Sequence, residues 1–301
     1  MTNAIEVHSV TRTYGRVRAL DTVSFAVPEH SILGLLGRNG SGKTTIMSII
    51  AGQDRPSSGQ VDVLGHTPFE HAPTLAQISY VRDNQRYPDD YRLHHVLRIA
   101  PDFAPNWNCD VAEELTDGFR IPAKTPIKKL SRGQLSSIAI VLGLASRAPI
   151  TLLDEPYLGL DVTARALFHR MLLHDYGQHP RTIVLSTHLI EESASLFDRV
   201  VILEQGGVAM NGDQDDVLAS AWVMSGTKDA VAELVADRPV LQRNTVGGLT
   251  SITADFALDD ATRIRARDLR VQFAPASLQD LVAAYGSSDT DSTDVKVAER
   301  A

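Results

Sequence analysis

The 301-residue sequence has a single cysteine, Cys109, and no long apolar run. One thiol cannot form an internal disulfide, which favours a reducing compartment. No apolar stretch approaches the roughly 18 residues of a membrane-spanning helix, and residues 1–15 lack the apolar segment of a secretory signal. We therefore expect a cytoplasmic protein. If it works at a membrane, a separate chain must supply the spanning part.

An excess of positive charge is also missing. The sequence has 29 Lys and Arg residues against 37 Asp and Glu residues, a formal net charge of −8. This balance argues against a nucleic-acid partner, which normally requires a basic surface. The apolar share of 43% and the charged share of 22% are ordinary for a soluble globular protein. The length allows about two domains of ~100–200 residues each.

Apolar runs that alternate with helical patterns fill the first two thirds of the chain. "SILGLLG", "PITLLDEP" and "RTIVLSTH" are typical of buried strands, whereas "KTTIMSIIAG" and "ARALFHRMLLHDYG" have helical spacing. Strand–helix alternation predicts a mostly parallel α/β sheet with helices on its faces. Short helical pieces at about residues 84–145 predict a helical subdomain within the domain of residues 1–220.

The pattern restarts near residue 220. Residues 221–286 follow the order strand, helix, strand, strand, helix, strand, with a final helix. This order predicts a small α+β ferredoxin-like accessory domain. Residues 287–301, "SSDTDSTDVKVAERA", have little to bury, and we expect a disordered tail there.

The stretch "GRNGSGKTT" matches the phosphate-loop pattern G-x-x-x-x-G-K-[ST] and stands between a predicted strand and a predicted helix. Backbone N–H groups of such a loop surround phosphate oxygens, and the helix N-terminus adds partial positive charge. Lys43 is the candidate for the β- and γ-phosphates, and the Thr44 hydroxyl for Mg²⁺. The candidate ATP-binding residues of this loop are Gly37, Arg38, Asn39, Gly40, Ser41, Gly42, Lys43, Thr44 and Thr45.

The run "PITLLDEP" delivers two carboxylates to the C-terminal end of a predicted strand, where ligands bind in open parallel sheets. Asp154 is a candidate ligand of Mg²⁺, directly or through water. Glu155, one residue further on, is a candidate general base for a water that attacks the γ-phosphate.

The stretch "LSRGQ", Leu130 to Gln134, raises a separate question. Ser131 is a good N-cap for the apolar helix that follows. A cap does not need Gly133 two residues later, where glycine costs up to ~1 kcal/mol relative to alanine. Gly133 is explained if another group must approach the backbone closely, and a helix N-terminus with a Ser hydroxyl suits a phosphate.

The set "GRNGSGKTT", "LSRGQ", "TLLDEP", "GLD" and "STH", in this order, resembles the ATP-binding subunits of ABC transporters. The resemblance covers roughly residues 4–215 and implies a P-loop ATPase fold of the ABC type. It also implies that two subunits bind head to tail around two ATP molecules with Mg²⁺. The signature of one subunit, Ser131, Arg132, Gly133 and Gln134, would then cap the ATP of the other. Arg132 departs from the commoner glycine.

The resemblance also implies functional roles for four further residues. Tyr14 matches the aromatic residue that stacks on adenine, and Asp161 the loop that links the two sites. His188 matches the switch histidine at the γ-phosphate. Asp83 stands where the family usually has a glutamine that touches Mg²⁺. Gln85, two residues later, is the alternative if the loop is shifted.

The resemblance implies an ATPase that lies on the cytoplasmic face of a cell membrane and drives a separate permease. A weaker similarity to export-type subunits found beside GntR-type regulators favours export. The alternative is a soluble ABC ATPase that acts on a ribosome or DNA. The histidines at 169, 174 and 179 are spaced by five and do not share a helical face. They are interpreted as surface residues and not metal ligands.

Overall fold

The computed structural model describes residues 2–82, 85–236, 238, 240–255 and 259–286. Asp83 and the predicted tail, residues 287–301, lie outside this part. The chain folds as two compact units, one that ends at Val208 and another that begins at Ala209. The proposed domain boundary at residue 220 therefore falls inside the second unit.

A six-stranded sheet has the order β5-β6-β7-β3-β8-β9, and all of its strands except β9 lie entirely within the first unit. Neighbouring strands from β5 to β8 run parallel. β3, β6 and β7 are buried at every position, which explains why their sequences are nearly continuous apolar runs. The strands span Ile32–Leu36 (β3), Ile78–Arg82 (β5), Ile150–Asp154 (β6), Thr182–Ser186 (β7), Arg199–Glu204 (β8) and Gly207–Asp213 (β9).

A second sheet in this unit has the order β2-β1-β4 and is antiparallel. Its strands are Asn3–Tyr14 (β1), Val17–Pro28 (β2) and Ser58–Val63 (β4). Apolar side chains of β1 and β2 pack with helix α1, Lys43–Ile50, and with β3 in one apolar core. This core fixes the loop that connects β3 to α1.

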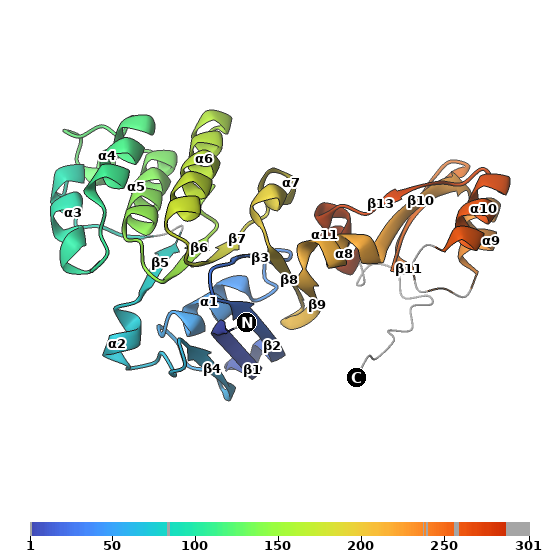
Figure 1. Ribbon diagram of the computed structural model, residues 1–301, viewed down its shortest axis with the longest axis horizontal. Coiled ribbons are helices and arrows are strands. Elements are labelled where there is room, and N and C mark those ends of the chain that lie inside the picture. Colours follow the sequence, from blue (N-terminus) through green and yellow to red (C-terminus); the bar gives the residue numbers. More distant parts are fainter. Residues whose placement is uncertain (1, 83–84, 237, 239, 256–258, 287–301) are drawn as a thin grey trace. The chain divides into compact units, whose positions relative to one another are not determined.

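Among the described residues, three α-helices lie in the region of about residues 84–145 for which the sequence predicts a helical subdomain (Figure 1). They are Leu93–Ile99 (α3), Cys109–Gly118 (α4) and Arg132–Ala145 (α5), with Val162–Gln178 (α6) beside them. Asn108, Ser131 and Asp161 cap α4, α5 and α6 by accepting hydrogen bonds from backbone N–H groups of the first turns. Shorter helices span Ala72–Leu75 (α2) and Ile190–Ser193 (α7).

The second unit has an antiparallel sheet with the order β11-β12-β10-β13. Its core contains Met224, Val231 and Ile252. The chain order of β10 to β13 with α9 and α10 is the βαββαβ order expected from the sequence. The elements are Gln214–Ser220 (α8), Ala221–Thr227 (β10), Lys228–Val235 (α9), Val240–Val246 (β11), Leu249–Asp255 (β12), Asp260–Asp268 (α10), Gln272–Pro275 (β13) and Leu278–Tyr285 (α11).

Two details of this unit differ from the sequence prediction. α8 was not expected, because its seven residues contain few apolar side chains. The last strand of the predicted order, β13, has only four residues and begins at Gln272, because Leu269 still forms the C-cap of α10. In the part of the chain that the structure describes, none of the helices is both long and apolar enough to cross a membrane.

Candidate functional site

The carboxyl ends of three parallel strands bring the predicted site residues together. Asp154 on β6 is level with Arg82 on β5 and with Ser186 on β7. The phosphate loop follows β3, which lies beside β7 in the same sheet. Residues from four distant segments of the sequence therefore meet at one edge of the sheet, the edge at which open parallel sheets bind ligands.

The phosphate loop depends on glycine at two positions. Gly37 has φ 139° and Gly42 has φ 107°, values that L side chains rarely adopt. A Cβ at Gly37 would lie 2.2 Å from the Leu203 carbonyl oxygen, and one at Gly42 would lie 2.6 Å from Leu20 Cδ2. The loop therefore needs these glycines to pack against β8 and β2 while its backbone faces outward.

Lys43 is buried inside this loop, where its Nζ donates to the carbonyl oxygens of Gly37 at 2.7 Å and Arg38 at 3.1 Å. Burial lowers the pKa of the Lys43 ammonium, and the charges of Glu155 and Asp154 raise it again. These two carboxylates help to keep a buried cation at this position. The other loop side chains differ in exposure: Arg38, Asn39, Gly40 and Thr44 are exposed, Thr45 is half-buried and Ser41 is buried.

Asp154 is buried, and its Oδ1 accepts a hydrogen bond from Ser186 Oγ at 2.6 Å. Burial raises the pKa of the neighbouring Tyr80 to about 12, and Tyr80 Oη lies 3.5 Å from the Asp154 carboxylate. No group of three His, Cys, Asp or Glu side chains suited to a metal ion occurs among the described residues. The assignment of Thr44 and Asp154 to Mg²⁺ therefore stays a prediction, in which phosphates and water supply most of the ligands.

Glu155 and His188 are in direct contact. Glu155 Oε2 lies 2.7 Å from His188 Nδ1 and accepts the His188 backbone N–H at 3.3 Å. The Glu155 backbone has φ 51°, a left-handed value for a residue other than glycine, and its N–H is held by Ser186. Glu155 Oε1 is buried and has no hydrogen-bond partner among the residues that the structure describes. One carboxylate oxygen of Glu155 is thus bound by His188, and the other has no donor among the described residues.

Tyr14 is the last residue of β1, and it is 46% exposed. Its hydroxyl donates to Asp54, and the Arg12 guanidinium lies 4.4 Å from the centre of its ring. Arg12 also forms an ion pair with Asp54 at 2.6 Å. Sequence analysis selected Tyr14 but missed both residues that hold its ring, because neither belongs to a motif.

The signature segment has a structural role within its own chain. Ser131 Oγ accepts the Gln134 N–H at 3.2 Å, and Gln134 Oε1 accepts the Ser131 N–H at 3.0 Å. A Cβ at Gly133 would lie 2.2 Å from the Gly159 carbonyl oxygen. The close approach that the sequence indicated at Gly133 is therefore already made by the backbone at Gly159.

The loop at residues 156–161 contains a residue that the sequence did not indicate. The Tyr157 hydroxyl is 2.7 Å from His169 Nε2 and accepts from Ser193 Oγ at 2.9 Å. The interpretation of His169 as a surface residue was wrong, because this side chain is half-buried and burial lowers its pKa. Asp161, by contrast, is exposed and caps α6.

Three further predictions concern Asp83, Gln85 and Arg132. Asp83 falls outside the described residues, so its role stays a prediction. Gln85 is exposed, and its N–H donates to the Arg82 carbonyl oxygen at 3.3 Å. Arg132, the departure from the common signature, is also exposed at the first position of α5.

Comparisons with known proteins agree with this geometry. The family model described as "ABC transporter" matches residues 20–158. An uncharacterized ABC transporter ATP-binding protein of Methanocaldococcus jannaschii is 32% identical over 219 residues, which cover 71% of this chain and 79% of the relative. The aliphatic sulfonates import ATP-binding protein SsuB of Burkholderia ambifaria is 30% identical over 246 residues and covers 82% of this chain and 73% of the relative.

The chain belongs to the ABC transporter ATP-binding family. A solved ATP-binding subunit of an ABC transporter superposes with a TM-score of 0.64 at 26% identity, covering 72% of this chain and 92% of that one. A dimeric ATP-binding cassette in a post-hydrolysis state, bound to ADP and Pi, has a TM-score of 0.61 at 25% identity, with coverage of 70% and 98%. The predicted P-loop ATPase fold of the ABC type is thereby confirmed, and the chain is an ATPase of this family.

We expect Gly133→Ala to lower the free energy of unfolding by about 1–3 kcal/mol, because the new methyl group would overlap the Gly159 backbone. Urea unfolding followed by circular dichroism measures the loss. Gly177→Ala on α6 is the matched control, because a Cβ there meets no atom within 4 Å. Equal stability of the two variants would contradict the close packing at Gly133.

Proposed function

We propose that this ABC ATPase is the energy-coupling subunit of a transporter, and that it hydrolyses ATP between two copies bound head to tail. The proposal rests chiefly on the contact between Glu155 and His188 beside the buried Lys43 and Asp154. This cluster combines a cation for phosphate oxygens, a carboxylate for Mg²⁺ and a carboxylate for a water. Together these groups are the parts that in-line phosphoryl transfer requires.

In the proposed mechanism, Thr44 and Asp154 would hold a Mg²⁺ ion, which would supply positive charge to the phosphate groups. Lys43 leaves the loop carbonyls and turns to the γ-phosphate. Glu155 takes a proton from the attacking water through a carboxylate oxygen. His188 orients that carboxylate through Oε2 and presents its own ring towards the γ-phosphate. Tyr14 supports the adenine ring by stacking.

Glu155→Gln is expected to keep ATP affinity and to reduce turnover by ~10²–10⁴, because an amide cannot act as the general base. Steady-state phosphate release measures turnover, and binding of a fluorescent ATP analogue measures affinity. Glu191→Gln is the matched control, since Glu191 is an exposed carboxylate at the start of α7. Turnover of Glu155→Gln close to that of the control would remove Glu155 from this role.

The signature is proposed to act on the partner's nucleotide. Within one chain, the side chains of Ser131 and Gln134 hydrogen-bond with each other's backbone N–H groups at the start of α5. Their hydrogen-bonding therefore orders the helix N-terminus as a unit that can face an anion from outside. A second copy, bound head to tail, would bring its phosphate loop to this helix end.

A mixture of Ser131→Arg and Lys43→Ala chains tests action between subunits. Each variant alone is expected to be inactive, whereas a mixed dimer keeps one composite site with both halves intact. We expect the mixture to recover part of the ATPase activity, measured at several mixing ratios. Mixed dimers that form, as shown by mass photometry of tagged chains, but recover no activity would make LSRGQ a purely structural element.

The proposed partner of the ATPase dimer is a separate membrane permease. A groove of about 590 Å³ in the first unit supports this part of the proposal. It lies between residues that follow β5 and the helical region, and its aromatic lining includes Tyr87, Tyr91 and Trp107. The same groove includes Gln85, a short distance along the chain from Arg82, which is level with Asp154. A permease segment seated there would contact the chain close to the catalytic edge.

Export is the proposed direction of transport, on the resemblance to export-type subunits described above. The relatives also include proteins named as importers of sulfonates and sulfate. Reconstitution with the permease that copurifies with the chain, followed by measurement of substrate movement across vesicles, tests the direction. ATP-dependent movement towards the side that carries the ATPase would overturn export.

A separate experiment tests whether Asp83 or Gln85 takes the role of the family's Mg²⁺-contacting glutamine. If Asp83 faces Mg²⁺, its negative charge beside the triphosphate, opposed only partly by Mg²⁺, is expected to keep basal hydrolysis low. Asp83→Gln would then raise the steady-state ATPase rate, and Gln85→Ala would leave it nearly unchanged. Loss of activity in Gln85→Ala alone would assign the role to Gln85.

A further inference from the structure

A second cavity of about 630 Å³ lies at the opposite end of the central sheet from the phosphate loop. Pro149 and Arg181 line it and stand immediately before β6 and β7, and His30, which also lines it, stands two residues before β3. The cavity is therefore at the amino ends of strands whose carboxyl ends carry the catalytic cluster. It shares no residue with the ATP site, and the proposed function does not use it.

A buried ionic triad adjoins this cavity, because two of its members, Arg147 and Arg181, line it. Asp175 lies between two arginines, with its Oδ1 at 2.7 Å from Arg147 Nη2 and its Oδ2 at 2.8 Å from Arg181 Nη1. Side-chain exposure is 18% for Arg147, 4% for Arg181 and 2% for Asp175. Two guanidinium groups share one carboxylate, so the triad carries one positive charge in excess.

Arg181 is the least satisfied member of the triad. Among the described residues, none accepts a hydrogen bond from its Nε or Nη2. Buried donors of a charged group that lack acceptors are unfavourable, because the hydration they lose is not replaced. Burial lowers the pKa of the Arg181 guanidinium, and Asp175 raises it. An anion in the cavity beside Arg147 and Arg181 would counter the excess positive charge of the triad.

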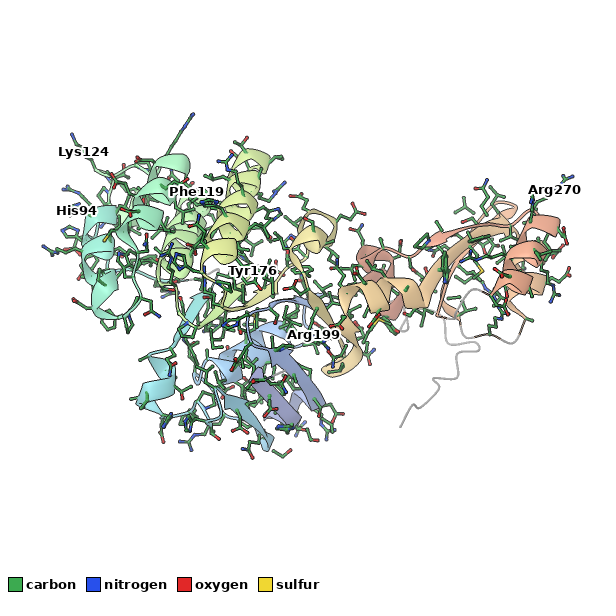
Figure 2. All side chains as sticks on the ribbon, in the orientation of Figure 1. His94, Phe119, Lys124, Tyr176, Arg199 and Arg270 are labelled. Atoms are coloured by element: carbon green, nitrogen blue, oxygen red, sulfur yellow. The ribbon has the colours of Figure 1, made fainter. Side chains whose placement is uncertain are left out.

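The mouth of the cavity contributes further polar groups. His30 and His179 line it and are both exposed. Tyr176 near the end of α6, labelled in Figure 2, donates to the His30 carbonyl oxygen at 2.6 Å and so holds this side of the mouth in place. Glu29 is the one carboxylate in the lining, and its exposed position leaves its charge screened by water.

We propose that this cavity binds a small organic anion through a phosphate or carboxylate group placed on Arg147 and Arg181. The volume falls within the ~300–1,000 Å³ of small-molecule sites, well beyond what a bare phosphate would fill. Ala4, Leu64, Pro149 and Pro180 supply apolar wall for the body of such a ligand. Glu29 lowers the affinity, because its charge opposes the anion.

Calorimetric titration of the full-length Lys43→Ala chain with pyrophosphate and with citrate, at constant ionic strength, tests the proposal. Lys43→Ala weakens phosphate binding at the nucleotide loop. We expect saturable one-to-one binding of at least one probe, and excess ADP should not displace it. Binding of only one probe identifies the head group as phosphate or carboxylate. Displacement by ADP, or no saturable binding of either probe, would overturn the proposal.

Substitutions that change the charge of residues at the cavity mouth test the location of the site and leave the buried triad intact. His179→Glu should weaken binding about three- to tenfold, and Glu29→Gln should strengthen it about two- to fivefold. His174→Glu adds the same charge on α6 outside the cavity lining and is expected to change the affinity little. Similar affinities in all three variants would overturn the assignment of the site. Arg147→Gln, checked for folding by circular dichroism, should abolish binding.

Discussion

The parallel register of β6 beside β7 is the constraint on which the catalytic edge depends. Because Asp154 is level with Ser186, one hydroxyl group can donate to the Asp154 carboxylate and also accept the Glu155 N–H. The same register places His188, two residues further on, against the Glu155 carboxylate. A slip of one residue would turn each side chain to the opposite face of the sheet. Apolar pairing within the strands therefore determines the geometry of the polar cluster at their ends.

A second set of contacts joins the signature helix to this cluster. The backbones of Gly133 and Gly159 touch, and Ser136 Oγ donates to the Leu158 carbonyl oxygen at 2.6 Å. Tyr157 continues the path to Ser193 at the end of α7, the helix that follows His188. Close-packed contacts of this kind are the physical means by which one element can displace another. Contact of a partner's nucleotide with the start of α5 would thus be transmitted to α7, the helix that follows His188.

The sequence predicted the features that depend on neighbouring residues in the chain. It did not predict the features that depend on tertiary contacts between distant segments. The phosphate loop, the strand that carries Asp154 and the order of elements in the second unit all follow from local patterns. The spacing of His169, His174 and His179 showed that they do not share a face, but it could not show which of those faces is buried. The partner of Gly133 was equally hidden, because Gly159 belongs to a different loop. Arg12, Asp54 and the ionic triad belong to no motif and meet only in the folded chain.

The two ends of β6 and β7 carry polar clusters, and Leu152, Leu153 and the three central residues of β7 between them are apolar. Leu152 and Leu153 on β6, and Ile183, Val184 and Leu185 on β7, offer no side-chain hydrogen bond between the cavity and the catalytic edge. A proton or hydrogen-bond relay along these strands is therefore excluded. Each strand has only five residues, roughly 16 Å of chain, and is packed on all sides. Because close-packed interiors transmit small displacements, a shift of the strand as a rigid rod is the route by which occupancy of one end would alter the geometry of the other.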